Sequence, residues 1–118
     1  MTKYDLCCVG HITLDKVITP KKTVDMPGGT AFYFSSAIKN LNPIQYKLAT
    51  ALATSEIEIA NKLQEEGIDV LVMPSKKTLC FENIYGENQD NRTQRVTAKA
   101  DPFTVDFLKD LDAEIFHL

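Results

Sequence analysis

The chain has 118 residues, of which 44% are hydrophobic and 25% charged, and its formal net charge is -3. This composition fits one globular domain or a part of one. The negative charge argues against nucleic acid as the main partner, because binding a polyanion needs clustered Lys and Arg. No run approaches the roughly 18 apolar residues that a membrane helix needs. The polar N-terminus lacks a secretory signal, so we expect a cytoplasmic protein with no membrane partner.

The number and spacing of the cysteines are consistent with a cytoplasmic location. Cys7 and Cys8 are neighbours and Cys80 stands alone, an odd number without the spacing of metal ligands. Adjacent residues of a strand point to opposite faces, so Cys7 and Cys8 are poorly placed to share one ligand. We therefore predict free thiols that pack as small hydrophobic side chains, and no metal site.

The first part of the chain alternates between strand and helix patterns. In order, we expect a buried strand over 6–9, a partly exposed strand over 12–19 with a return strand at Val24, a helix after Gly28-Gly29, a strand over 46–53, a second helix, and a strand over 68–73. The first helix is indicated by apolar residues from Ala31 to Leu41. Ser55 and Glu58 have the spacing of a capping box for the second. The alternation predicts a doubly wound α/β sheet.

The pattern changes after Pro74, which we expect to end the third of these apolar strands. Segments 79–85 and 92–98 flank a polar turn and predict a β-hairpin. Asp101-Pro102 has the form of a helix start, with Asp as the cap and Pro in the first turn. A last apolar strand begins at Ala113. Because the chain stops inside this strand, we expect more protein to follow Leu118 in the natural product.

Three motifs, in this order, make the sequence resemble the ribokinase-like (PfkB) kinase family. The opening strand ends in Gly10 and an aspartate follows five residues later, in Gly10-His11-Ile12-Thr13-Leu14-Asp15. A glycine doublet then leads directly into a helix, in Pro27-Gly28-Gly29-Thr30-Ala31. Finally, a small strand pair interrupts the main alternation, and the later hairpin can add to it. The resemblance covers the whole chain but only about the first third of a family member.

The resemblance implies a fold and a domain. The implied fold is a three-layer α/β/α (Rossmann-like) sheet with a small β-sheet lid. Residues 1–118 are expected to be the N-terminal part of this one domain, with lid strands near 12–26 and 78–98. In the family the lid closes over a sugar. The spacing of the glycines fits neither a Walker loop nor a three-glycine dinucleotide fingerprint, which disfavours a generic nucleotide-binding domain.

The resemblance also implies where a substrate binds. The aspartate matching Asp15 accepts hydrogen bonds from substrate hydroxyls, a role that suits a charged acceptor. The backbone at Gly28 and Gly29 comes close to the substrate. Further substrate-binding candidates lie beside these motifs or on the hairpin: Thr13, Thr30, Phe81 and Asn83. Many members carry asparagine where this chain has Tyr33, which either contacts a different substrate or is a core residue.

The resemblance implies that the catalytic residues lie outside this segment. Family members transfer the γ-phosphoryl group of ATP, and the general base is an aspartate in a C-terminal Gly-x-Gly-Asp turn that this chain lacks. ATP and Mg²⁺ are therefore implied as cofactors, with their binding region beyond residue 118. We expect no kinase activity from the segment alone. His11 and His117 are predicted to be structural histidines satisfied by the backbone.

Two functions stay open. The first is the N-terminal segment of an ATP-dependent sugar or nucleoside kinase. The alternative is a stand-alone, non-catalytic module for ligand binding or dimerisation, because lid strands with open edges often pair. The sequence does not distinguish sugar, nucleoside and sugar phosphate as the ligand. A homodimer through the lid strands is compatible with both functions.

Overall fold

The computed structural model describes residues 4–41, 44–87 and 92–118. Its main sheet contains β1 (Tyr4–Val9), β4 (Tyr46–Ala53), β5 (Asp69–Ser75) and β8 (Ala113–His117). The order across the sheet is β5-β4-β1-β8, and every neighbouring pair is parallel. These strands are apolar runs, as expected for parallel strands that are covered by helices. The predicted doubly wound α/β arrangement is confirmed.

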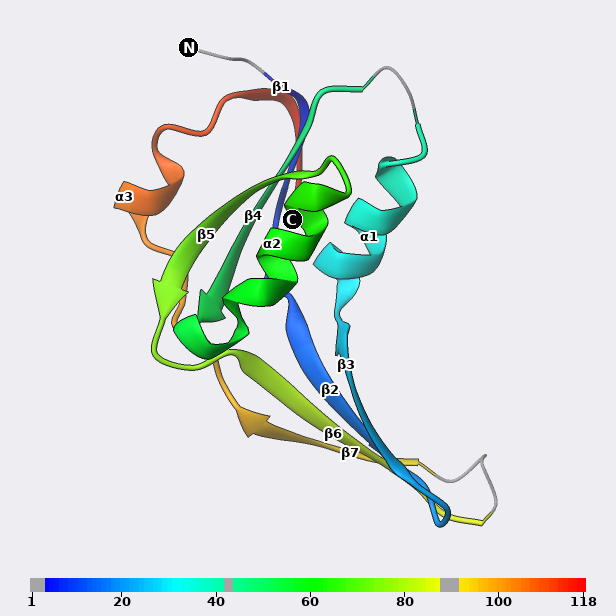
Figure 1. Ribbon diagram of the computed structural model, residues 1–118. Helices are drawn as coiled ribbons and strands as arrows, with labels where there is room; N and C mark the ends of the chain where they lie inside the picture. Colours follow the sequence, from blue (N-terminus) through cyan, green and yellow to red (C-terminus); the bar gives the residue numbers. More distant parts are fainter. Residues whose placement is uncertain (1–3, 42–43, 88–91) are drawn as a thin grey trace.

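Helices α1 (Thr30–Ile38) and α2 (Ile57–Glu65) connect β1 to β4 and β4 to β5. Right-handed crossovers in one direction put both helices on the same face of the sheet, and Figure 1 shows them together there. The short helix α3 (Val105–Leu108) lies apart from them, before β8. The core lies between α1, α2 and the sheet, and its most buried members include Ile12, Leu48 and Leu52. No helix in the described ranges has the length and apolar character needed to cross a membrane.

A second sheet projects from the carboxyl end of the first (Figure 1). It contains β2 (Thr13–Ile18), β3 (Thr23–Gly28), β6 (Leu79–Tyr85) and β7 (Arg92–Ala98), in the order β3-β2-β6-β7. The hairpin predicted over 79–98 is present and joins the earlier strand pair through parallel contacts between β2 and β6. We call this sheet the lid. Part of the predicted hairpin turn, residues 88–91, lies outside the described residues.

Buried threonine hydroxyls hold the segments where the chain crosses between the sheets. At the first crossing, the amide of Ile12 donates to Oγ1 of Thr50 at 2.9 Å. At the crossing from β5 to β6, Oγ1 of Thr78 accepts from the amide of Ala53, also at 2.9 Å. Both threonines are buried, so these hydroxyls satisfy amides that water does not reach. The lid is therefore tied to the carboxyl end of β4.

Two predicted helix starts are wrong. Ser55 and Glu58 do not form a capping box: a short 3-10 turn covers Thr54–Glu56, and the Ser55 hydroxyl donates to the Glu56 carboxylate instead. Asp101 does not cap α3, because its carboxylate accepts from the amide of Lys76. Thr104 takes the cap position and accepts from the amide of Phe107.

Two element ends also differ from the prediction. Helix α1 stops at Ile38, so Leu41 is not part of its apolar face and is 54% exposed. Strand β5 continues through Pro74 to Ser75, although proline has no amide to donate. β5 is an edge strand of its sheet, where a missing donor on the outer side is tolerated.

Replacing Thr50 with valine tests the anchoring of the first crossing. Thr50→Val keeps the side-chain shape but leaves the buried amide of Ile12 without a partner. We expect the free energy of unfolding to fall by about 1–3 kcal/mol, measured by urea denaturation. Thr93→Val, on an exposed residue of β7, is the control and should stay within about 0.5 kcal/mol of the wild type. Equal stability of the two variants would contradict this role of Thr50.

Candidate functional site

A cavity of about 420 Å³ opens at the carboxyl ends of β1 and β8. From β1 the chain continues outward to β4 and then β5, and it later returns to form β8 on the other side of β1. The order in which strands are added to the sheet therefore reverses at β1. Ligands of open α/β sheets bind in the crevice at such a switch point. The cavity is lined by the end of β1, the first turn of α1, both histidines and part of the lid: Cys8, Val9, Gly10, His11, Thr13, Gly29, Thr30, Ala31, Leu79, Phe81, His117 and Leu118.

Asp15 lies on β2 next to this cavity and is held in place from two sides. The Thr13 hydroxyl donates to Oδ1 of Asp15 at 2.8 Å. Gly28 is paired with Thr13 across the β2–β3 hairpin, and a Cβ on Gly28 would collide with Oδ2 of Asp15. The absence of a side chain at Gly28 therefore leaves space for the carboxylate. Asp15 is half-buried, and a carboxylate has more acceptor positions than this one bond uses.

Gly29 forms the tight link between β3 and α1. Its backbone has φ 88° and ψ 158°, a combination that only glycine adopts readily. A Cβ here would also lie 3.0 Å from Cγ2 of Thr13 and 3.1 Å from the carbonyl oxygen of His11. Space and backbone conformation thus both require glycine. The link places the first turn of α1, with Thr30, at the cavity.

The two histidines that line the cavity are both stacked on phenylalanines. His11 stacks on Phe103 with ring centroids 4.4 Å apart, and its Nε2 lies 3.1 Å from the carbonyl oxygen of Asp101. His117 stacks on Phe34 at 4.3 Å. The predicted backbone partner is confirmed for His11. Sequence reasoning did not place either histidine at the site, since only the fold brings the ends of β1 and β8 together.

Cys8 lines the cavity with a buried thiol. Burial raises the pKa of the Cys8 thiol, while a hydrogen bond with Tyr46 partly opposes the rise. Cys8 therefore stays a neutral thiol at physiological pH. Within the part of the chain that the structure describes, no three His, Cys, Asp or Glu residues gather as metal ligands.

The structure brings most of the predicted substrate residues to one place. Thr13, Gly29, Thr30 and Phe81 line the cavity, and Asp15 and Gly28 adjoin it through Thr13. Asn83 lies farther along the lid.

Tyr33 is separate from this group. Its side chain is 57% exposed, contacts the neighbouring Phe32 ring at 5.5 Å and does not line the cavity. A core role for Tyr33 is thus wrong.

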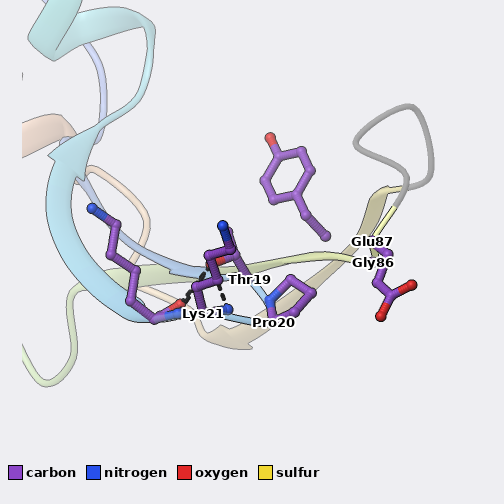
Figure 2. A pocket seen from close by; sticks show the side chains of 7 residues that line it. Thr19, Pro20, Lys21, Gly86 and Glu87 are labelled. Carbon is purple, nitrogen blue, oxygen red and sulfur yellow. Dashed lines mark hydrogen bonds between the residues drawn. The ribbon is translucent and has the colours of Figure 1, made fainter.

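A larger cavity of about 560 Å³ lies at the far tip of the lid. Figure 2 shows its lining, in which the turn after β2 faces Gly86 and Glu87. The dashed lines are bonds of the Thr19 hydroxyl, which accepts from the amides of Lys21 and Lys22 and donates to the Lys22 carbonyl. These bonds stabilise the turn itself. None of the predicted substrate residues lies there, so the cavity at the switch point is the better candidate.

Comparison with known proteins identifies the architecture. No family model and no curated protein matches the chain. Among solved structures, a pyrophosphate-dependent kinase of the ribokinase family in complex with sulfate matches with a TM-score of 0.80 and 25% identity, covering 96% of this chain and 40% of that one. The chain has the ribokinase-like fold. The match spans 40% of that kinase, and the resemblance that the sequence motifs predicted is confirmed at the level of the fold.

Further ribokinase-like structures agree. A pyrophosphate-dependent ribokinase-family kinase bound to a pyrophosphate analogue and myo-inositol has a TM-score of 0.78 at 23% identity, covering 95% of this chain and 38% of its own. Ribokinase from Giardia lamblia has a TM-score of 0.75 at 13% identity, with 92% and 38% covered. This chain thus spans about two-fifths of the length of the structures it matches. Identities this low show a shared fold and leave the substrate open.

Replacing Gly29 with alanine tests the link between lid and helix. We expect Gly29→Ala to lower the free energy of unfolding by about 1–3 kcal/mol, because alanine is strained in this backbone region. Thermal or urea denaturation measures the change. Gly86→Ala is the matched control, since no atom lies within 4 Å of a Cβ at that position. A Gly29→Ala variant as stable as Gly86→Ala would contradict the strained link.

Proposed function

We propose that this chain is the N-terminal segment of a small-molecule kinase and that it carries part of the acceptor site, where the phosphorylated hydroxyl compound binds. The observation that carries the proposal is the position of Asp15. Its carboxylate lies between Thr13 and the bare backbone of Gly28, beside the cavity at the switch point of the sheet. A carboxylate with free acceptor positions suits a compound rich in hydroxyl groups.

In this proposal the acceptor is bound between the lid and the main domain. Asp15 and Phe81 are paired across β2 and β6, so they lie side by side on the lid. The lid would bind the acceptor from one side, with Asp15 fixing its hydroxyls and Phe81 packing on it. The amides at Gly29 and the first turn of α1 would meet the acceptor from the main domain. Cytoplasmic location and pairing of two copies through the lid stay predictions.

The phosphoryl donor is the second part of the proposal. We expect ATP with Mg²⁺, and pyrophosphate is the donor to test beside it, because two of the similar structures are pyrophosphate-dependent kinases. The described residues supply no cluster of metal ligands, so we assign no residue of this segment to the donor or its metal. The general base is expected in the remainder of a family member. Residues 1–118 alone should therefore turn over neither donor.

Replacing Asp15 with asparagine tests the acceptor site. In the natural protein that contains this segment, we expect Asp15→Asn to lower kcat/KM for the acceptor by about 100-fold or more, because hydrogen bonds to a charged group are lost. Neutral polyols and nucleosides are assayed with each donor. The unfolding temperature should change little, since Asp15 is half-buried and keeps an oxygen toward Thr13.

Asp25→Asn is the matched control. Asp25 is an exposed carboxylate on β3, next to the residue paired with Asp15 and so on the opposite face of the lid. It should leave kcat/KM unchanged. Equal losses in both variants would show a general charge effect and contradict the specific role of Asp15. Saturable binding of a polyol by the natural protein, without turnover of either donor, would favour the alternative of a non-catalytic binding module.

A further inference from the structure

Three passages of the chain between the main domain and the lid are joined to one another by hydrogen bonds. Residues 10–12 lead from β1 to β2, residues 76–78 lead from β5 to β6, and residues 99–104 lead from β7 to α3. Among the described residues, the lid strands pair with one another and not with strands of the main sheet. The position of the lid therefore depends on what joins these passages.

Asp101, in the third passage, bonds the second one twice. Its amide donates to Oγ of Ser75, the last residue of β5, at 2.8 Å. Its carboxylate accepts from the amide of Lys76 at 3.1 Å. The buried Ser75 hydroxyl in turn donates to the carbonyl of Lys77 at 2.7 Å. One serine hydroxyl thus joins both passages as donor and acceptor.

His11, in the first passage, contacts the third one in two ways. Its Nε2 lies 3.1 Å from the carbonyl oxygen of Asp101. A carbonyl only accepts, so Nε2 carries the proton and donates. The imidazole also stacks on Phe103 at 4.4 Å, and Phe103 stacks on Phe107 of α3 at 5.9 Å. The side chain of His11 therefore fixes the start of the lid against the segment by which the chain leaves it.

We propose that His11, Ser75, Asp101 and Phe103 form a clamp that fixes the lid relative to the main domain, with His11 as a positioning residue of the acceptor site. His11 acts through Asp101 and Phe103, without contact with the acceptor. It lies four residues before Asp15, so the clamp sets the place of that carboxylate relative to the first turn of α1. This inference rests on the proposed function.

The clamp affects binding of the acceptor more than the chemical step. A lid that is already in place binds without a further cost of ordering. When the clamp is broken, only a fraction of the molecules has the lid in the binding position, and the apparent affinity falls by that fraction. Lower stability alone has another effect: it reduces the amount of folded enzyme, which lowers the apparent kcat and leaves KM unchanged. KM and kcat thus distinguish positioning from a purely structural role.

Replacing His11 with phenylalanine keeps a ring for stacking and removes the donor to Asp101. The assay uses the natural protein with myo-inositol, ribose and inosine as acceptors and with ATP or pyrophosphate as donor. We expect the KM for the acceptor to rise about tenfold, the change that one hydrogen bond can cause, while kcat stays within about threefold. His11→Gln retains a side-chain N–H that can reach the same carbonyl, so it should restore the KM of the wild type.

Ser75→Ala breaks the clamp at its other side. We expect a similar rise in KM of about tenfold, because the amide of Asp101 loses its partner. In the double variant His11→Phe/Ser75→Ala, the rise should be smaller than the product of the two single effects, since residues of one network are not additive. If His11→Phe does not fold, an unchanged KM in Ser75→Ala overturns the inference.

Ala60→Gly is the control for stability. Ala60 is buried in α2, outside the three passages and the cavity lining. Glycine destabilises a helix interior, so the unfolding temperature should fall while KM stays unchanged. Amide hydrogen exchange gives a readout that needs no activity. In His11→Phe the amides of Lys76 and Asp101 should exchange about tenfold faster than in the wild type, because the clamp opens locally. In Ala60→Gly these two amides should exchange as in the wild type.

The outcomes also separate this inference from the proposed function. If the wild type phosphorylates no acceptor of the panel, the proposed function fails, while faster exchange in His11→Phe still supports the clamp and equal exchange overturns it. If Asp15→Asn lowers kcat/KM but His11→Phe changes neither KM nor exchange, only the clamp is wrong. Equal rises of KM in His11→Phe and His11→Gln would indicate direct contact of the imidazole with the acceptor and overturn the positioning role.

Discussion

The arrangement of the two sheets depends on hydrogen bonds at the points where the backbone passes between them. Thr50 and Thr78 each bond a buried amide at 2.9 Å, one on the way out to the lid from β1 and one on the way out from β5. Where the chain returns from β7, the amide of Asp101 donates to Oγ of Ser75 at 2.8 Å. These bonds join segments far apart in sequence at the carboxyl ends of the main strands. They determine where the lid stands relative to the cavity.

The glycine doublet depends on the same arrangement. The chain returns from β3 to α1 within a few residues, so Gly29 takes a backbone conformation that other residues avoid. Gly28 sits against the carboxylate of Asp15 because the β2–β3 pairing puts Thr13 opposite it. Close approach of backbone and carboxylate makes a small polar site at the joint between lid and main domain. The Thr13 hydroxyl and the bare backbone of Gly28 thus hold the Asp15 carboxylate in one position at this joint.

The candidate site has an apolar frame and few polar groups. His11 and His117 are held by stacking on Phe103 and Phe34, so their orientation is set by aromatic packing. The buried oxygen of Asn83 has no partner, unlike the bonded Thr13 hydroxyl. An unsatisfied buried group is a cost to the folded state.

Local patterns of apolar and polar residues in the sequence predicted much of the fold. Continuous apolar runs such as 6–9 and 46–53 predict buried parallel strands, because both faces of such strands are covered. Asp15, Gly28 and Gly29 stood out because their motifs resemble those of the ribokinase-like family. Local pattern was wrong at Ser55 and Asp101, because the same polar side chains found other partners: Glu56 for the first, and the amide of Lys76, distant in sequence, for the second.

The sequence by itself therefore determined the order of elements and the parallel α/β class, since these follow from local hydrophobicity and turn chemistry. The glycine and aspartate motifs were singled out by their resemblance to the ribokinase-like family. Only the tertiary structure decided the exposure of Tyr33, the place of His11 and His117 beside one cavity, and the burial of Asn83 without a partner. The physical reason is that exposure and hydrogen bonding depend on contacts between distant segments, which strand register and chain crossings create.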